Sequence, residues 1–339
     1  MKKLYAILTV VLLFCQLFSA CGRTAEPLTK TGFCLNTVIE VTIFENGSEA
    51  LLEECFSLAE TYEGYFSATI PDSDIAKINA SAGTPVTVHD ETAELLSIGI
   101  AYGELSGGRF DITIGGLSEL WDISTKALLE QTDASMIPAN NQIEQALSDV
   151  DYHAVRIDGN VVTLQNQDAR IDLGGIAKGY IADRMKEFLI ENGVTSGFIN
   201  LGGNVLVLGP KPDGSPCSIA IQRPFSEEGD VAASVKITDQ TVVSSGIYER
   251  YFEAGGRIYH HILDTATGYP YDNGLLSVTV ITENSVDGDA LSTICFSLGL
   301  TDGMELIERT DGAEAVFITD DETLHTSSGI GTDIPFTEF

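Results

Sequence analysis

The segment 172–180, Asp-Leu-Gly-Gly-Ile-Ala-Lys-Gly-Tyr, decides how this chain is interpreted. It joins two strand-like runs, 161–164 and 170–173, to a helical pattern of apolar residues over 181–189. Glycines at a strand-to-helix junction let backbone N–H groups approach a phosphate, and the helix N-terminus and Lys178 add positive charge. The segment could instead be a tight turn in which the glycines serve packing and the lysine is solvated.

Asp172 places a carboxylate beside the glycine turn. Because a carboxylate repels phosphate, a metal ion or a hydrogen-bonding heterocycle is expected nearby.

Acidic side chains outnumber basic ones in this chain. The chain has 18 Lys and Arg against 50 Asp and Glu. Removal of residues 1–20 takes away two lysines and leaves a net charge of −34. That charge repels nucleic acid and anionic lipid, so no nucleic-acid partner is expected. The acidity is also compatible with a role in solubility alone.

Residues 1–20 have the features of a signal peptide. Two lysines precede the apolar run 4–18, which is short for a membrane span, and Ser-Ala then precedes Cys21. This ending resembles a bacterial lipobox, which would anchor the protein by a lipid at Cys21 on the extracytoplasmic face of the inner or plasma membrane. A plain cleaved signal peptide is the alternative. We expect residues 21–30 to form a tether and residues 31–339 a single domain.

The remaining cysteines do not form a recognisable framework. Cys34, Cys55, Cys217 and Cys295 are widely spaced, and no CxxC pair or histidine-rich cluster indicates zinc. A bridge between Cys34 and Cys55 stays open. Cys295 lies in an apolar helical run and is expected in the core.

Periodicity predicts an α+β fold with mixed or antiparallel sheets and packed helices. Helices are expected over 48–65, 89–105, 286–298 and 304–309, with another beginning after a turn at 71–74. Strands are expected over 38–44, 197–208, 217–222, 231–237, 241–245 and 315–319, with a hairpin-like stretch around 259–263 and 276–281. The polar region 123–147 is expected to be an insertion of loops and helix.

The segment 108–113, Gly-Arg-Phe-Asp-Ile-Thr, has groups that suit a flat heterocycle. Phe110 offers a ring face and Asp111 can accept a hydrogen bond from a ligand N–H. A helix cap followed by a strand, with Phe110 in the core, is the alternative.

Asp289 and Thr293 are four residues apart, on one face of a predicted helix. A carboxylate and a hydroxyl are hard oxygen ligands, which suit Mg²⁺. Alternatively, Asp287 or Asp289 caps the helix and Thr293 faces a neighbour.

Two histidines follow each other in the segment 259–264, Tyr-His-His-Ile-Leu-Asp. Neighbouring residues on a strand point to opposite faces, so only one of the two can enter a given pocket. His261 and Asp264 could supply a base or a phosphate contact. Alternatively, His260 faces solvent, His261 is structural and Asp264 opens the turn before Pro270.

Together these motifs resemble the ApbE family of flavin transferases over residues 31–299. The motifs are Gly108–Asp111 with Thr113, Asp172–Gly179, Asn200–Gly203, Ser245-Gly246 with Tyr248, His261-Ile262 with Asp264 and 267–270, and Asp289 with Thr293. The chain departs from the family pattern at residues 35–37, at Thr69 and at Arg109, where family members often carry Met-Gly-Thr, a tyrosine and a small residue.

The resemblance implies a T-fold-like ApbE body and Mg²⁺-dependent transfer of FMN from the substrate FAD to a protein threonine, with release of AMP. It implies FAD contacts from Arg109, Phe110, Asp111, Asp172, Lys178 and Ile262. It implies Mg²⁺ ligands from the Gly175 carbonyl, Asp289 and Thr293, and a catalytic role for His261, with Asp264 as a second candidate base.

Two other functions use the same motifs: a Mg²⁺-dependent FAD pyrophosphatase that gives FMN and AMP, and a non-catalytic flavin-binding lipoprotein. The chain contains no Asp-x-x-Ser/Thr-Gly-Ala-Thr acceptor signature. The flavinylated partner is therefore expected to be a separate membrane or extracytoplasmic redox protein.

Overall fold

The computed structural model describes residues 26–227 and 229–339. The predicted signal peptide, Cys21 and the first part of the tether lie outside these residues. An eight-stranded sheet, antiparallel throughout, has the order β1-β2-β6-β7-β10-β13-β14-β15. Its strands are β1 (Leu28–Cys34), β2 (Thr37–Ile43), β6 (Gly197–Leu201), β7 (Asn204–Leu208), β10 (Thr241–Gly246), β13 (Leu275–Thr282), β14 (Glu314–Thr319) and β15 (Leu324–Thr326).

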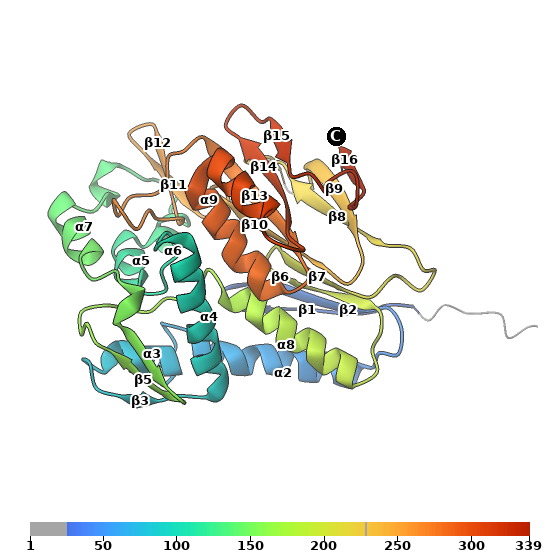
Figure 1. Ribbon diagram of the computed structural model, residues 1–339, viewed down its shortest axis with the longest axis horizontal. Helices are drawn as coiled ribbons and strands as arrows, with labels where there is room; N and C mark the ends of the chain where they lie inside the picture. The colour runs from blue at the N-terminus through green and yellow to red at the C-terminus, as the bar shows by residue number, and fades with distance from the viewer. Residues whose placement is uncertain (1–25, 228) are drawn as a thin grey trace, which may run out of the picture.

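Both faces of this sheet are covered (Figure 1). The long helices on one face are α2 (Glu49–Phe66), α8 (Ala177–Glu191) and α9 (Ser285–Glu308). A small sheet covers the other face and consists of β8 (Cys217–Gln222), β9 (Val231–Ile237) and β16 (Phe336–Glu338). Along β14, Val316 and Ile318 pack toward the small sheet, whereas Ala315 and Phe317 belong to the cluster under α9. This alternation explains why the central strands are apolar at almost every position.

The remaining elements gather at one end of the molecule (Figure 1). They include the helices α3 (Asp74–Ala80), α4 (Asp90–Ser106), α5 (Gly115–Trp121), α6 (Ile123–Lys126) and α7 (Asn140–Leu147), with short 3-10 turns at Ala134–Met136 and Tyr152–Ala154. They also include a sheet of β3 (Val86–Thr87), β5 (Val161–Leu164) and β4 (Val155–Asp158), and the hairpin of β11 (Tyr251–Ala254) and β12 (Arg257–His260). The α+β fold class predicted from the sequence is confirmed.

Local capping explains where several helices begin and end. The Ser48 hydroxyl accepts a hydrogen bond from the backbone N–H of Leu51 at 3.2 Å, and α2 begins at Glu49, the residue after Ser48. Ser73 caps α3 in the same way. Gly107 ends α4 in the left-handed region, at φ 64°. These boundaries confirm the helices that the sequence predicted here.

Some expectations about strands are wrong. β1 begins at Leu28, so the last three residues of the predicted tether belong to the sheet. The stretches 259–263 and 276–281 do not pair, because β12 pairs with β11 whereas β13 lies between β10 and β14. The run 170–173 makes only an isolated bridge, from Arg170 to Ile114.

Other expectations need smaller corrections. The predicted strand 197–208 is two strands, because Gly202 and Gly203 turn the chain with positive φ. β14 is followed by β15 and β16, so it does not close the chain. By contrast, the two predicted C-terminal helices are both present, because α9 is broken between them at Gly299, with φ 80° and ψ 177°. The four described cysteines are buried and free, so no bridge joins Cys34 and Cys55.

A close contact between the backbones of α8 and α9 fixes the end of the molecule that holds the candidate site. A Cβ atom at Gly179 would lie 2.3 Å from the Ser285 carbonyl oxygen and 2.6 Å from the Val286 Cα. One turn further along α8, the Asp183 carboxylate accepts hydrogen bonds from the N–H groups of Ser285 and Val286, both at 2.8 Å. Gly179 and Asp183 therefore dock the first turn of α9 onto α8.

We predict that Gly179→Ala lowers the free energy of unfolding by about 1–3 kcal/mol, because the added methyl group must push two backbones apart. Gly64→Ala is the matched control, since a Cβ at that position of α2 has nothing within 4 Å. The control should be neutral or stabilise by about 0.5–1 kcal/mol. Equilibrium denaturation by urea measures both, and equal effects of the two substitutions would contradict the close approach.

Candidate active site

A cavity of about 230 Å³ lies where α5, α6, α8, α9 and the β10–β11 connection meet. Every predicted site residue except Asp264 lines it: Arg109, Phe110, Asp111, Asp172, Gly175, Lys178, His261, Ile262, Asp289 and Thr293. Segments more than 180 residues apart in the sequence therefore contribute to one site.

The predicted metal ligands lie close to one another. The buried Asp289 carboxylate accepts a hydrogen bond from Gly179 N–H at 2.9 Å, and its Oδ1 lies 3.6 Å from Lys178 Nζ. Thr293 follows one turn later on α9 and its Oγ1 lies 3.3 Å from Ser245 Oγ. A methyl group at Gly175 would stand 3.9 Å from the same Thr293 oxygen. A carboxylate, a hydroxyl and the glycine loop thus meet at one wall of the cavity.

These donors are hard oxygen groups, which fit a small hard cation better than zinc. Within residues 26–227 and 229–339, no group of three or more His, Cys, Asp and Glu side chains is placed to hold a metal ion. A cation here would therefore depend on a single buried carboxylate, together with a hydroxyl and a backbone carbonyl.

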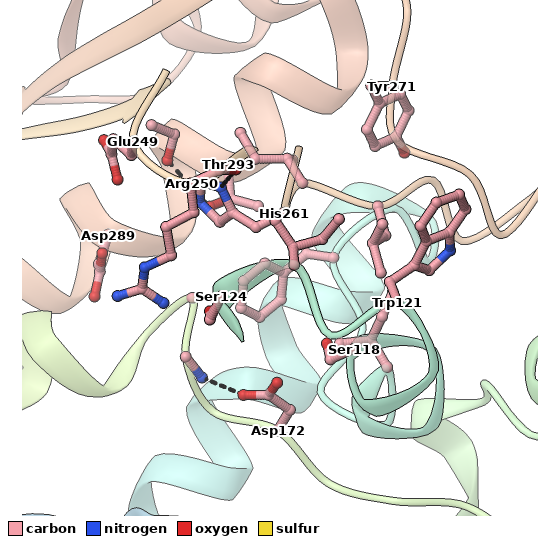
Figure 2. A pocket seen from close by; sticks show the side chains of 18 of the residues that line it. Ser118, Trp121, Ser124, Asp172, Glu249, Arg250, His261, Tyr271, Asp289 and Thr293 are labelled. Atoms are coloured by element: carbon pink, nitrogen blue, oxygen red, sulfur yellow. Dashed lines mark hydrogen bonds between the residues drawn. The ribbon is translucent and has the colours of Figure 1, made fainter. Parts of the chain in front are cut away.

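The glycine loop before α8 is held from both sides. Asn79 brackets Ile171, accepting from its N–H at 2.7 Å and donating to its carbonyl at 2.9 Å. Asp172 Oδ1 accepts from Gly174 N–H at 2.8 Å (Figure 2). The Ile176 side chain does not cap α8, but the N–H groups of Ile176 and Ala177 donate to the Leu173 carbonyl and that of Gly179 donates to Asp289, so a carboxylate already complements the start of this helix.

The segment 108–113 contributes packing as well as polar groups. The Phe110 ring is buried beneath the glycine loop, 3.1 Å from where a Cβ at Gly175 would stand. Arg109 donates to the Ser297 carbonyl at 3.1 Å and ties this segment to α9. Asp111 Oδ1 accepts from the N–H and hydroxyl of Thr113, and its Oδ2 accepts from Tyr152 N–H at 2.9 Å. Although burial raises the pKa of Asp111, these three bonds hold the local turn.

The two neighbouring histidines lie in different environments, although β12 ends at His260 and His261 follows it in a bend, so strand alternation does not set their directions. His260 is buried, with Nε2 2.8 Å from the Tyr271 carbonyl oxygen, and burial lowers its pKa to about 4. His261 lines the cavity, and its Nδ1 lies 3.3 Å from the Arg250 carbonyl oxygen. Surrounding protein and the nearby Arg250 charge lower the pKa of His261 to about 3. A neutral ring that donates from Nδ1 keeps its lone pair on Nε2.

Asp264 lies outside the cavity lining. Its Oδ1 accepts from Ala266 N–H at 2.8 Å and its Oδ2 accepts from the Thr267 hydroxyl at 2.9 Å. The carboxylate thus shapes the turn before Pro270. This position does not support the predicted role of Asp264 as a base, because both of its carboxylate oxygens accept hydrogen bonds within the turn.

Sequence reasoning missed part of the lining. The residues not predicted include Ser118, Trp121, Ser124, Glu249, Arg250 and Tyr271. Figure 2 shows Glu249, Arg250 and Asp289 on one side of the cavity and Trp121 and Tyr271 on the other, with His261 between them. The charged pair Glu249-Arg250, directly after the Ser245-Gly246 motif, was the available signal.

The region 123–147 is more than an insertion, because it contributes to the cavity through α6. Ile123 is buried in the lining, whereas Ser124 is exposed and lies at the rim. Gly174, Glu249 and Arg250 are also exposed lining residues, so the cavity opens to solvent between α6 and these groups.

Comparisons with known proteins agree with this architecture. The model of the ApbE family matches residues 35–317. A Treponema pallidum (strain Nichols) protein named FAD:protein FMN transferase is 33% identical over 95% of this chain and 92% of its own length. A Klebsiella pneumoniae (strain 342) protein of the same name is 36% identical over 83% of this chain and 85% of its own.

Solved structures have the same fold. The crystal structure of the ApbE protein from Thermotoga maritima superimposes with a TM-score of 0.80 at 31% identity, covering 89% of this chain and 97% of that one. The flavin transferase ApbE from Vibrio cholerae gives a TM-score of 0.79 at 25% identity, with the same coverage. The ApbE-like fold expected from the sequence is confirmed. The chain belongs to the ApbE family.

Proposed function

We propose that the chain transfers FMN from FAD to a threonine hydroxyl of a separate acceptor protein, with release of AMP and with Mg²⁺ as cofactor. The observation that carries the proposal is the convergence of Gly175, Lys178, Asp289 and Thr293 beside a neutral His261 in one cavity. The relatives named FAD:protein FMN transferase support flavin transfer as the class of reaction.

Asp289, Thr293 and the Gly175 carbonyl would hold the Mg²⁺ ion. Asp289 is 4% exposed, and its Oδ1 lies 3.6 Å from Lys178 Nζ, which is too long for a strong hydrogen bond. A divalent cation would therefore add to the stabilisation of this buried negative charge. When bound, the ion would neutralise charge on the diphosphate of FAD and polarise the phosphate under attack.

The positive groups of the cavity bind and orient the diphosphate. In a chain of net charge −32, a dinucleotide with two phosphates needs local positive potential. Lys178 supplies it from the first turn of α8, and Arg250 supplies it from the connection between β10 and β11.

His261 takes the proton of the acceptor hydroxyl. The threonine oxygen forms a bond to the FMN-side phosphorus while the bond from that phosphorus to the bridging oxygen breaks, and AMP leaves with that oxygen. The hydroxyl proton moves to Nε2 of His261, which is unprotonated because the Arg250 carbonyl accepts from Nδ1.

Hydrolysis of FAD to FMN and AMP is the alternative that the open rim favours. Ser124, Gly174, Glu249 and Arg250 line the cavity and are exposed, so water can reach the same phosphorus as the threonine. A flavin-binding lipoprotein without chemistry would bind FAD and release no AMP. Incubation with FAD, Mg²⁺ and an acceptor separates the three by covalent flavin, free FMN or neither.

The acceptor would be a membrane or extracytoplasmic redox protein on the same side of the membrane as this enzyme. The support comes from the sequence, where Cys21 follows an apolar leader and residues 22–27 precede the first strand. A lipid at Cys21 would hold the enzyme on the same membrane as such a partner.

We predict that Asp289→Asn reduces FMN transfer at limiting Mg²⁺ by about 100-fold, since the lost charge stabilisation is on the order of 3 kcal/mol. Asp302→Asn is the control, because Asp302 is an exposed carboxylate on the same helix. Mass spectrometry of the acceptor over a Mg²⁺ titration measures both. The same Mg²⁺ dependence in wild type and Asp289→Asn would refute the metal assignment.

We predict that His261→Ala slows FMN transfer by about 10²–10⁴-fold, because proton removal from the hydroxyl loses its base. The affinity for FAD should change little, which flavin fluorescence measures in parallel. His153→Ala serves as the control, since His153 is an exposed histidine outside the cavity. Transfer at the wild-type rate by His261→Ala would remove this residue from the reaction.

A further inference from the structure

We propose that Leu128 and Leu129, together with the acidic side chains around them, form the surface on which the acceptor protein docks; the proposal rests on the transfer function above. Leu128 is 84% exposed and Leu129 is 48% exposed. In the part of the chain that the structure describes, no other two consecutive residues are both large, apolar and exposed. Scattered exposed apolar residues are ordinary, whereas adjacent ones beside a site indicate a contact surface.

The leucine pair lies next to the mouth of the cavity. It directly follows α6, in which Ile123 and Ser124 line the cavity, and Ser124 is part of the exposed rim. The backbone continues the turn of α6, because Leu128 N–H donates to the Thr125 carbonyl at 3.2 Å and Leu129 N–H donates to the Lys126 carbonyl at 3.1 Å. A protein segment on this pair would lie beside the opening through which its threonine must enter.

Side-chain bonds hold the pair in this exposed position. Lys126 Nζ donates to the carbonyls of Trp121, in the cavity wall, and of Met136, at the far end of the loop. The Thr132 hydroxyl donates to the Glu253 carbonyl in β11, the strand that pairs with β12 just before His261. The loop is thus fastened to the cavity wall at Trp121 and to the neighbouring strand β11, and both leucines stay exposed.

The charges around the pair indicate the chemistry of that partner. Asp122, Glu130 and Asp133 are exposed carboxylates on the same segment. Lys126, the one basic residue between Asp122 and Asp133, is turned inward onto two carbonyls. An apolar pair within an acidic ring fits a polypeptide segment that carries an apolar side chain flanked by lysine or arginine. The same acidity disfavours an anionic lipid surface.

The double variant Leu128→Ser/Leu129→Ser tests the proposal in the full chain, with FAD, Mg²⁺ and, as probe, a flavin-free redox domain carrying an Asp-x-x-Thr-Gly-Ala-Thr segment. We expect the KM for this domain to rise about tenfold, while kcat at saturating domain and the affinity for FAD stay unchanged. Glu130→Lys should also raise the KM for this domain, because it places a positive charge against a basic partner.

Ile190→Ser is the matched control. Ile190 is 51% exposed near the C-terminal end of α8, and Lys178 lies twelve residues earlier, at the end of the helix that meets the cavity. At 1.5 Å per residue the two are about 18 Å apart along the axis. This substitution removes a similar apolar side chain away from the mouth, and the KM for the acceptor domain should stay unchanged.

Several results would overturn the proposal. An unchanged KM in the double variant would show that the leucines do not contact the acceptor. A parallel loss of FAD affinity would show that they act through the cavity instead. Wild-type binding to anionic phospholipid vesicles that the double variant loses would assign the pair to a membrane. If the wild type formed no covalent flavin at all, the proposed transfer function would fail and this proposal with it.

Discussion

The candidate site depends on one steric constraint, the close approach of α8 and α9. Gly179 lets the two backbones meet, and Asp183 caps the first turn of α9 from the same face of α8. The contact sets the position of Lys178 against Asp289 and of the glycine loop against Thr293. A larger residue at position 179 would separate the lysine from the carboxylate, although every polar group would still be present.

The charges around the contact between α8 and α9 determine what the cavity can bind. The chain carries many more acids than bases, so its overall field opposes a dinucleotide. The cavity offsets this field with Lys178 and Arg250, and its buried carboxylate, Asp289, is the charged ligand of the divalent ion that we propose. Beside these charges, His261 stays neutral because protein surrounds it and Arg250 is near. A cationic histidine could bind phosphate, whereas a neutral one can accept a proton.

Periodic and capping patterns predicted much of the fold, because they depend on neighbours in sequence. Ser48 and Gly107 marked helix ends correctly. Strand pairing was harder: β12 and β13 were expected to pair, but the partner of a strand is chosen by long-range packing, which no local pattern records. The glycine and aspartate motifs contain most of the predicted residues that line the cavity. Asp264 lies in a turn outside the lining, and an aspartate that shapes a turn has the same sequence pattern as one that faces a ligand. Trp121 was not predicted, because a core tryptophan has no distinguishing pattern.

The most direct test is a crystal structure of the protein grown with FAD and Mn²⁺ in place of Mg²⁺, with the ion located by its anomalous scattering. The account predicts one ion bound by oxygens from Gly175, Asp289 and Thr293, with the diphosphate between it and Lys178 and the FMN-side phosphorus facing His261. An ion at any other place, or a diphosphate bound away from the start of α8, would contradict it.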